Sequence, residues 1–297
     1  MNIQTIPAKT IVSGYMTDGW LGAEYNMNIY KGCCHGCIYC DSRSECYGIE
    51  DFDTVRAKEN AAAVIEKDLR AKRKTGLLYT GGMSDPYNPF EKKLGLTRAA
   101  LELAAKYGFG IGIFTKSSLV LRDIDLMKKI KALAPVAVHM TITTADDALC
   151  GMIEPNVCPS SERFDALREL SANGIKCGVL LTPVLPFIND TEENILEIVR
   201  RAHDSGAKWV HAYASFGVTM RGNQRDYFYA RLDKCFPGKK ELYIKTFGET
   251  YYCISPENER LWRAFVKKCG ELGLKYKNKD IAGLIKCDYE NSQISLF

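Results

Sequence analysis

Three cysteines in one short stretch are the residues whose type and spacing point most directly to chemistry. Cys33, Cys37 and Cys40 follow the spacing C-x3-C-x2-C. Three thiolates this close in sequence can reach one metal centre. An all-cysteine cluster of four irons normally takes four thiolates, so three ligands leave one iron with an open position. An open position is typical of catalytic metal sites and not of closed structural ones.

The spacing alone also allows a zinc site. A structural zinc ion normally takes four protein ligands, and Cys34 and His35 lie in the same loop as candidates for the fourth. Such a site would contain zinc and no iron.

The cysteine loop resembles the cluster motif of the radical S-adenosylmethionine (SAM) superfamily, C-x3-C-x-aromatic-C, with Tyr39 in the aromatic position. Further stretches resemble its spore photoproduct lyase-like branch, whose members are often labelled DNA repair photolyases. These stretches run in order between residues 25 and 215: 80–89 (TGGMSDPYNP), 114–118 (FTKSS), 121–123 (LRD), Glu154-Pro155 with Arg163, and 183–190 (PVLPFIND). The resemblance implies a [4Fe–4S] cluster on Cys33, Cys37 and Cys40, with SAM as the second cofactor, and favours iron over zinc.

The resemblance also implies which residues contact SAM. Gly81 and Gly82 match a glycine-rich turn that binds the SAM amine, and glycine allows close approach of backbone carbonyls. Other branches end this turn in Glu, whereas here Ser84 or Asp85 would supply the polar group. The alternative for the glycines is an ordinary turn after a strand.

Three further positions complete the predicted SAM contacts. Lys116 would pair with the SAM carboxylate, unless it is an ordinary surface lysine. Thr141 and Thr143 alternate along an expected strand and so share a face. Either could bind SAM or its ribose, or serve only strand packing. Tyr39 would offer an aromatic face at the cluster rim.

Alternating strands and helices must position these residues. A first strand is expected to end at Ile29-Tyr30, and five more are expected at 76–80, 110–115, 136–143, 176–181 and 208–214. The expected helices are 53–74, 96–107, 119–133, 161–173 and 191–205. Strict alternation predicts an α/β fold with a parallel sheet. Six units are too few for an eight-stranded barrel, and the resemblance implies an open, partial (β/α)6 TIM-type barrel. The motifs fall at the carboxyl ends of strands, where barrels of this type carry their chemistry.

We divide the chain into three parts. Residues 1–24 look like an irregular arm on the outside, and residues 25–216 form the radical SAM core. Residues 217–297 form a C-terminal α+β extension that covers the barrel, with a helix at 226–235, strand-like residues at 242–253 and an amphipathic helix at 257–272.

The C-terminal extension also raises an alternative function. It holds 15 Lys and Arg against 10 Asp and Glu, and 13 of the 31 aromatic residues. Basic and aromatic residues together can bind nucleic acid through phosphates and stacked bases. The chain would then be a nucleic-acid-binding protein with a structural or redox-sensing cluster. The plainer interpretation is a small aromatic core with a solvated lysine face.

Composition limits the setting in which the chain works. No run of about 18 apolar residues occurs, so we expect no membrane span. The first residues lack a basic segment followed by an apolar one, and we expect no signal peptide. Twelve cysteines among 297 residues indicate a reducing compartment, and we expect the cytoplasm.

The function implied by the resemblance is reductive cleavage of SAM to a 5′-deoxyadenosyl radical, which abstracts hydrogen from a substrate that the sequence does not identify. A low-potential electron donor of the flavodoxin or ferredoxin type would be a partner, and nucleic acid stays open as a substrate. True spore photoproduct lyases carry a cysteine hydrogen donor after the second strand. No cysteine occurs here between Cys46 and Cys150, which argues against repair of that lesion.

Overall fold

A seven-stranded sheet forms the centre of the molecule in the computed structural model, which describes residues 3–14, 20–213 and 215–294. The order is β10-β9-β8-β7-β6-β3-β2, with β10 and β2 at the two edges, so the sheet stays open. Within this sheet β3, β6, β7, β8, β9 and β10 run parallel, and β2 pairs antiparallel with β3. The bounds are β2 Val12–Gly14, β3 Tyr25–Met27, β6 Leu77–Thr80, β7 Gly110–Thr115, β8 Val136–Thr141, β9 Lys176–Leu180 and β10 Val210–His211. The expected open, partial barrel is confirmed.

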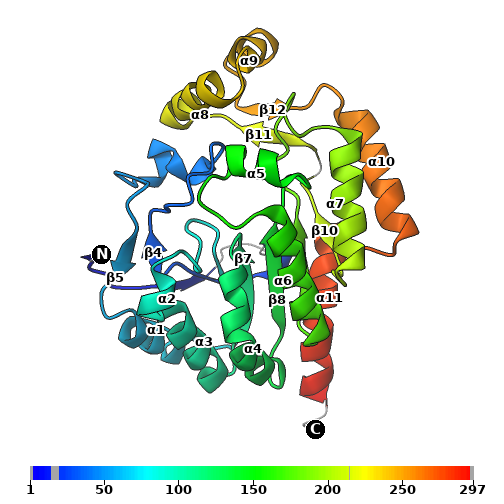
Figure 1. The fold of residues 1–297 in the computed structure, drawn as a ribbon. Coiled ribbons are helices and arrows are strands. Elements are labelled where there is room, and N and C mark those ends of the chain that lie inside the picture. Colours follow the sequence, from blue (N-terminus) through cyan, green and yellow to red (C-terminus); the bar gives the residue numbers. More distant parts are fainter. Residues whose placement is uncertain (1–2, 15–19, 214, 295–297) are drawn as a thin grey trace.

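Helices follow the parallel strands and cover the outer face of the sheet (Figure 1). They are α1 Ala61–Arg70, α3 Leu96–Tyr107, α4 Ile124–Lys131, α6 Ser160–Ala172 and α7 Glu192–Asp204. Alternate strand residues such as Ile111, Ile113, Val136 and Val138 are buried in the main apolar core. Burying each such side chain contributes about 1.5–3 kcal/mol, which fixes the face of each strand.

Large polar and aromatic side chains line the inner face of the sheet. Trp209 Nε1 donates to His139 Nδ1 at 3.1 Å, and His139 Nε2 lies 3.0 Å from the Tyr79 hydroxyl. The Tyr79 hydroxyl in turn donates to the Leu21 carbonyl. Burial lowers the pKa of His139 to about 3, so the imidazole is neutral. His139 is therefore part of the core.

Two distant segments fill the space against the inner face. The 3-10 turn η1 Trp20–Gly22 and helix α11 Asn278–Ile294 place Leu21, Ile281 and Ile285 in one apolar cluster with the inner-face residues. The Leu21 N–H donates to Asn278 Oδ1 at 2.8 Å. The prediction of an irregular arm on the outside was therefore wrong for this part of residues 1–24, and α11 was not predicted.

A second sheet lies beside the first. Its order is β1-β5-β4, with β1 Gln4–Ile6, β5 Arg56–Lys58 and β4 Tyr30–Lys31. The predicted helix 53–74 was wrong over its first part, because Arg56–Lys58 pairs with β1 on one side and β4 on the other. The helix begins only at Ala61.

The C-terminal residues add a further layer at the end of the barrel where the cysteine loop lies (Figure 1). The layer consists of the antiparallel strands β11 Gly217–Thr219 and β12 Tyr252–Ile254 and the helices α8 Gly222–Cys235 and α9 Lys239–Phe247. Helix α10 Asn258–Glu271 follows and packs on α7. The predicted strand 242–253 was wrong over α9. Tyr243 and Phe247 are spaced four apart, and their rings lie 5.3 Å apart on one helix face. The domain boundaries stay a prediction.

Short helices complete the connections. They are α2 Glu91–Leu94, α5 Asp147–Ile153 and the 3-10 turns η2 Asp41–Arg43, η3 Glu45–Tyr47 and η4 Ser118–Asp123. The predicted helix 119–133 thus starts as the turn η4. Within the described parts of the chain, none of the helices combines the length and apolar character needed to span a bilayer.

Candidate functional site

The cysteine loop, residues 33–40, connects β4 to η2, and its entry depends on a glycine. The Cys33 N–H donates to the Phe52 carbonyl at 2.8 Å. Gly32 has a φ of +79°, and a Cβ at this position would lie 2.3 Å from the Thr54 carbonyl oxygen. Glycine alone tolerates both the positive φ and the close approach. The local sequence therefore sets a tight turn directly before the first predicted ligand.

The three predicted ligands lie close enough for the charge on one to affect another. Cys37 is buried, and Cys33 and Cys40 are half-buried. Burial is the main cause that raises the pKa of Cys33 to about 12 and the pKa of Cys37 well above its usual range, and charge on Cys40 contributes to both shifts. Burial also raises the pKa of Cys40. Buried thiols need nearby positive charge to ionise, and metal binding provides it.

A lysine supplies part of that positive charge. Lys116 follows the last residue of β7, and its Nζ lies 5.7 Å from the centre of the Tyr39 ring. Its ammonium lowers the pKa of Cys37 and of Cys40. Burial by itself would lower the pKa of Lys116, but the charges of Cys37 and Glu154 raise it overall. Lys116 is thus a half-buried cation beside the cysteine loop.

The geometry does not favour the zinc alternative. Among the residues that the structure describes, no three His, Cys, Asp or Glu side chains converge as around a single metal ion. Cys34 packs against the main apolar core, and His35 Nδ1 faces Asp85 Oδ2 at 3.7 Å. Thiolates that hold a four-iron cluster bind different iron atoms and need not converge on one point. Both candidates for a fourth zinc ligand therefore have other contacts in the described structure.

The segment after α5 holds the cysteine loop from one side. The Ile38 N–H donates to the Ile153 carbonyl at 3.0 Å, and the Asn156 N–H donates to the His35 carbonyl at 3.2 Å. Asn156 Nδ2 also donates to the Cys34 carbonyl at 2.9 Å. Sequence reasoning missed Asn156, although it directly follows the Glu154-Pro155 stretch that the branch resemblance singled out.

A buried ion pair lies behind this contact. Glu154 Oε2 and Arg163 Nη1 are 2.5 Å apart, and neither side chain has exposed surface. The Tyr39 hydroxyl donates to the other oxygen of Glu154. Arg163 also donates to the carbonyls of Thr141 and Cys158. The Tyr39 ring, predicted at the cluster rim, is therefore fixed through its hydroxyl to a charged network.

The turn after β6 contains the two predicted glycines in different surroundings. Gly81 has a φ of +99°, and a Cβ there would lie 2.0 Å from the Phe114 carbonyl oxygen. A Cβ on Gly82 would meet no atom of the described residues within 4 Å. Met83 Sδ lies 3.9 Å from the Ser42 hydroxyl, which places this turn next to the end of the cysteine loop. Gly81 is therefore required for packing, whereas Gly82 borders open space.

Ser84 and Asp85, the two alternatives for the polar group, differ in how their oxygens are used. Asp85 accepts hydrogen bonds from the Thr115 hydroxyl at 2.8 Å and from the Lys116 and Tyr87 N–H groups at 2.7 and 2.8 Å. Its carboxylate thus ties the turn after β6 to the end of β7. Ser84 Oγ is buried without a hydrogen-bond partner in the described structure. A SAM contact at this turn therefore suits Ser84 better than Asp85.

Thr141 and Thr143 are both buried at the carboxyl end of β8. The Thr143 carbonyl accepts hydrogen bonds from Asn189 and Asn194 at 2.7 and 3.1 Å. Thr143 Oγ1 is buried and has no partner among the described side chains and backbone. Orphaned hydroxyls at Ser84 and Thr143, together with open space at Gly82, fit a polar ligand at this end of the barrel. The roles of these residues toward SAM stay predictions.

Comparison with known proteins supplies the family. The profile of the Radical SAM superfamily matches residues 27–202. An uncharacterized protein of Mycobacterium tuberculosis is 31% identical over 247 residues, which cover 80% of this chain and 71% of that protein. An uncharacterized protein of Methanocaldococcus jannaschii is 37% identical over 174 residues, covering 58% of this chain and 64% of that protein.

The fold is similar to that of a spore photoproduct lyase mutant solved with bound AdoMet and dinucleoside spore photoproduct. The TM-score is 0.63 at 15% identity, over 86% of this chain and 77% of the lyase. The profile match covers more than half of the chain, including the cysteine loop and the carboxyl ends of β6, β7 and β8. The chain therefore belongs to the radical SAM superfamily.

Proposed function

We propose that this chain is a radical SAM enzyme that holds a [4Fe–4S] cluster through Cys33, Cys37 and Cys40 and cleaves SAM reductively. The observation that carries the proposal is the grouping of three thiols, one buried and two half-buried, in one loop beside the Lys116 ammonium. Superfamily membership supports it, as does the likeness in fold to a lyase solved with bound AdoMet.

The residues around the loop fit the remaining parts of SAM. When bound, the cluster supplies one electron to the SAM sulfonium, which splits to methionine and a 5′-deoxyadenosyl radical able to abstract hydrogen. The Lys116 ammonium would pair with the SAM carboxylate. The turn at Gly82 and the Ser84 hydroxyl would accept hydrogen bonds from the SAM amine. The hydroxyls of Thr141 and Thr143 would hydrogen-bond SAM or its ribose.

An apolar cluster is suited to keeping water away from this chemistry. Cys37, Ile38 and Tyr39 pack with residues from the β11–α8–α9–β12 layer, including Val218, Met220, Phe228, Tyr243 and Cys253. The layer thus buries one side of the cysteine loop. Exclusion of water matters because a radical generated in an open site would be lost to side reactions.

The partners are proposed more broadly. A low-potential donor of the flavodoxin or ferredoxin type would supply the electron. The hydrogen-bearing substrate is unidentified, and nucleic acid is one candidate class. A protein that only binds nucleic acid would load iron and sulfide without turning SAM over, so one experiment separates the two functions.

The test is anaerobic reconstitution, followed by analysis of iron, sulfide and zinc and then addition of dithionite and SAM. We expect about four irons per chain and formation of 5′-deoxyadenosine. Cys33→Ala should lose iron and activity together. Cys34→Ala is the matched control, because Cys34 lies in the same loop but packs into the core. A fully loaded cluster that yields no 5′-deoxyadenosine would refute the proposed enzyme.

A further inference from the structure

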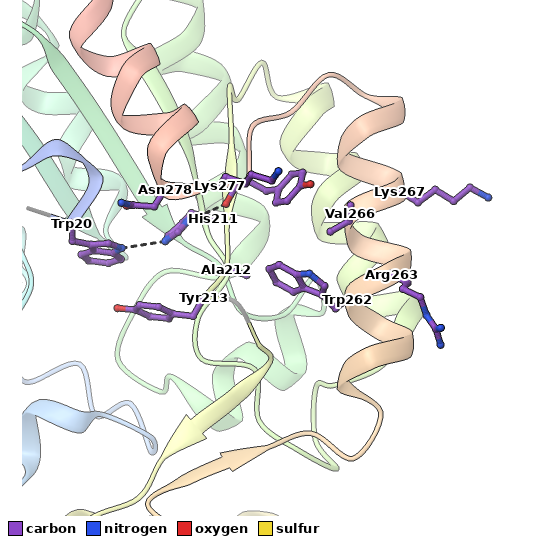
Figure 2. Close-up of a pocket in the computed structure, with 11 residues that line it drawn as sticks. Trp20, His211, Ala212, Tyr213, Trp262, Arg263, Val266, Lys267, Lys277 and Asn278 are labelled. Carbon is purple, nitrogen blue, oxygen red and sulfur yellow. Dashed lines mark hydrogen bonds between the residues drawn. The ribbon is translucent and has the colours of Figure 1, made fainter. Parts of the chain in front are cut away.

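A pocket of about 700 Å³ lies at the side of the barrel, away from the cysteine loop. It is bounded by η1, the end of β10, α10 and the segment that leads into α11 (Figure 2). Its lining residues are Trp20, His211, Ala212, Tyr213, Trp262, Arg263, Val266, Lys267, Tyr276, Lys277 and Asn278. None of them belongs to the predicted cluster or SAM contacts.

One wall of the pocket is a stack of aromatic rings. The Trp20 indole stacks on Phe114 with ring centres 4.8 Å apart, and on its other side it lies nearly parallel to Tyr213 at 5.6 Å. Tyr213 is 48% exposed. Tyr213 thus presents a partly exposed ring that is backed by two further rings.

Hydrogen bonds hold this wall in place. Trp20 Nε1 donates to His211 Nε2 at 3.1 Å, as Figure 2 shows, and His211 Nδ1 lies 3.2 Å from the Tyr276 carbonyl. A neutral imidazole with its proton on Nδ1 satisfies both contacts, and burial lowers the pKa of His211. Trp262 from α10 meets the edge of Tyr276 on the opposite wall. These contacts fix the positions of Trp20, His211 and Tyr276 in the lining.

The charges around the pocket have one sign. Arg263, Lys267 and Lys277 line it, and its described lining contains no carboxylate. Within the described part of the chain, these three cations have no ion-pair partner. Two neighbours on α10 differ, because Arg260 pairs with Glu257 and Glu192, and Lys268 pairs with Glu271. Figure 2 shows Arg263 and Lys267 projecting from α10 away from the rings. Positive charge without an ion-pair partner therefore lies on the α10 side of the pocket and at Lys277.

We infer that this pocket binds a nucleobase that carries phosphate. The aromatic walls suit a planar base, since base–aromatic stacking does not depend on a particular base. The rim cations suit the phosphates, which would lie outside the pocket. A free nucleotide and a base of a single-stranded nucleic acid offer the same chemistry. A base inside a duplex is already stacked and paired, so a duplex should bind weakly.

Binding to the full-length reconstituted protein tests the inference. The probes are a fluorescein-labelled oligothymidylate of about ten nucleotides, its duplex with oligoadenylate, and thymidine monophosphate as competitor. We expect the single strand to bind with a slope of about −2 in a plot of log binding constant against log salt concentration. Each of the three cations contributes about 0.7 to the size of this slope. Complete competition by the mononucleotide at similar affinity identifies a free nucleotide as the ligand, and much tighter binding of the strand identifies nucleic acid.

Matched variants assign the binding to this pocket. Tyr213→Ala should weaken binding about tenfold or more by removing the exposed stacking face. Lys267→Ala should reduce the salt slope by about 0.7. Lys268→Ala removes the same charge from the next position of α10, where the lysine is already paired, and should leave the slope nearly unchanged.

Several results would overturn the inference. They are no binding of either the strand or the mononucleotide, equal affinity for the duplex, equal effects of Lys267→Ala and Lys268→Ala, or no effect of Tyr213→Ala. Displacement of the strand by SAM, which has a base but no phosphate, would also overturn it by assigning the pocket to SAM. Binding should survive in Cys33→Ala, so failure of the cluster chemistry and failure of this inference are distinguishable.

Discussion

Replacing Glu154 by Gln tests how strongly the segment after α5 holds the cysteine loop. Glu154 and Arg163 form an ion pair with no exposed side-chain surface, and the Tyr39 hydroxyl donates to the same carboxylate. Burial by itself would raise the pKa of Glu154, but Arg163 and Lys116 lower it overall, so it is charged at neutral pH. Gln keeps the size and removes the charge, and it turns one of the two acceptor oxygens into an N–H donor.

The expected cost follows from the partner that stays behind. Breaking a buried pair by neutralising one member typically costs about 3–5 kcal/mol, because the other charge is left in a medium that solvates it poorly. Arg163 keeps its hydrogen bonds to the Thr141 and Cys158 carbonyls at 2.9 and 3.0 Å. We therefore expect a loss of stability toward the lower end of this range. At about 2–4 °C per kcal/mol, the melting temperature should fall by roughly 6–12 °C.

Thermal unfolding of the cluster-free chain at pH 7, followed by circular dichroism or calorimetry, measures this loss. Glu192→Gln is the control, because Glu192 pairs with Arg260 at the surface, where the side chains are 43% and 51% exposed. Exposed pairs contribute about 0–1 kcal/mol. A double variant that replaces Glu154 and Arg163 by Leu and Met should recover much of the lost stability. Equal and small losses for Glu154→Gln and Glu192→Gln would refute the reasoning.

Three further predictions concern individual positions. Gly81→Ala should lower the melting temperature strongly, because the added methyl group would meet the Phe114 carbonyl. Gly82→Ala should fold normally and weaken SAM binding as measured by calorimetry. Equal melting temperatures for the two variants would contradict this prediction. Ser84→Ala should keep or raise stability, because the buried hydroxyl has no partner in the described structure, and should weaken SAM binding; unchanged affinity would remove Ser84 from the site. His139 has a folded pKa of about 3 and an unfolded pKa of about 6.5, so between these values only the unfolded chain takes up the proton. Stability should therefore fall by about 1.4 kcal/mol per pH unit as the pH drops below 6.5, and His139→Gln should lack this slope in pH-dependent unfolding.

The elements that were predicted well have signals within their own sequence. Helix α3 runs from Leu96 to Tyr107 as predicted, between Gly95 and Gly108, which both adopt positive φ. Strand β7 is an apolar run that matches its predicted bounds. Strand β5 was missed because its partners, β1 and β4, come from distant segments and its own sequence is short and polar.

The candidate site divides in the same way. The cysteine spacing is local, and it located the loop. The hydrogen bonds of Asp85 are not local. Its carboxylate accepts from the Thr115 hydroxyl and the Lys116 N–H at the end of β7, about 30 residues away. The link between Tyr39 and Glu154 spans 115 positions. Pairings of this kind are set by the sheet order, which motif spacing does not specify.

The hydrogen bond between Leu21 and Asn278 spans 257 positions and has a consequence for how the protein is made. Closing so long a loop costs little extra free energy, since each doubling of loop length adds only about 0.6 kcal/mol. Contacts between such distant residues slow folding far more than they weaken the folded state. During translation the barrel interior around Tyr79 and Trp209 stays uncovered until residue Ile285 has left the ribosome. The nascent chain is therefore exposed to aggregation for nearly its whole synthesis, and we expect its yield to depend on chaperones.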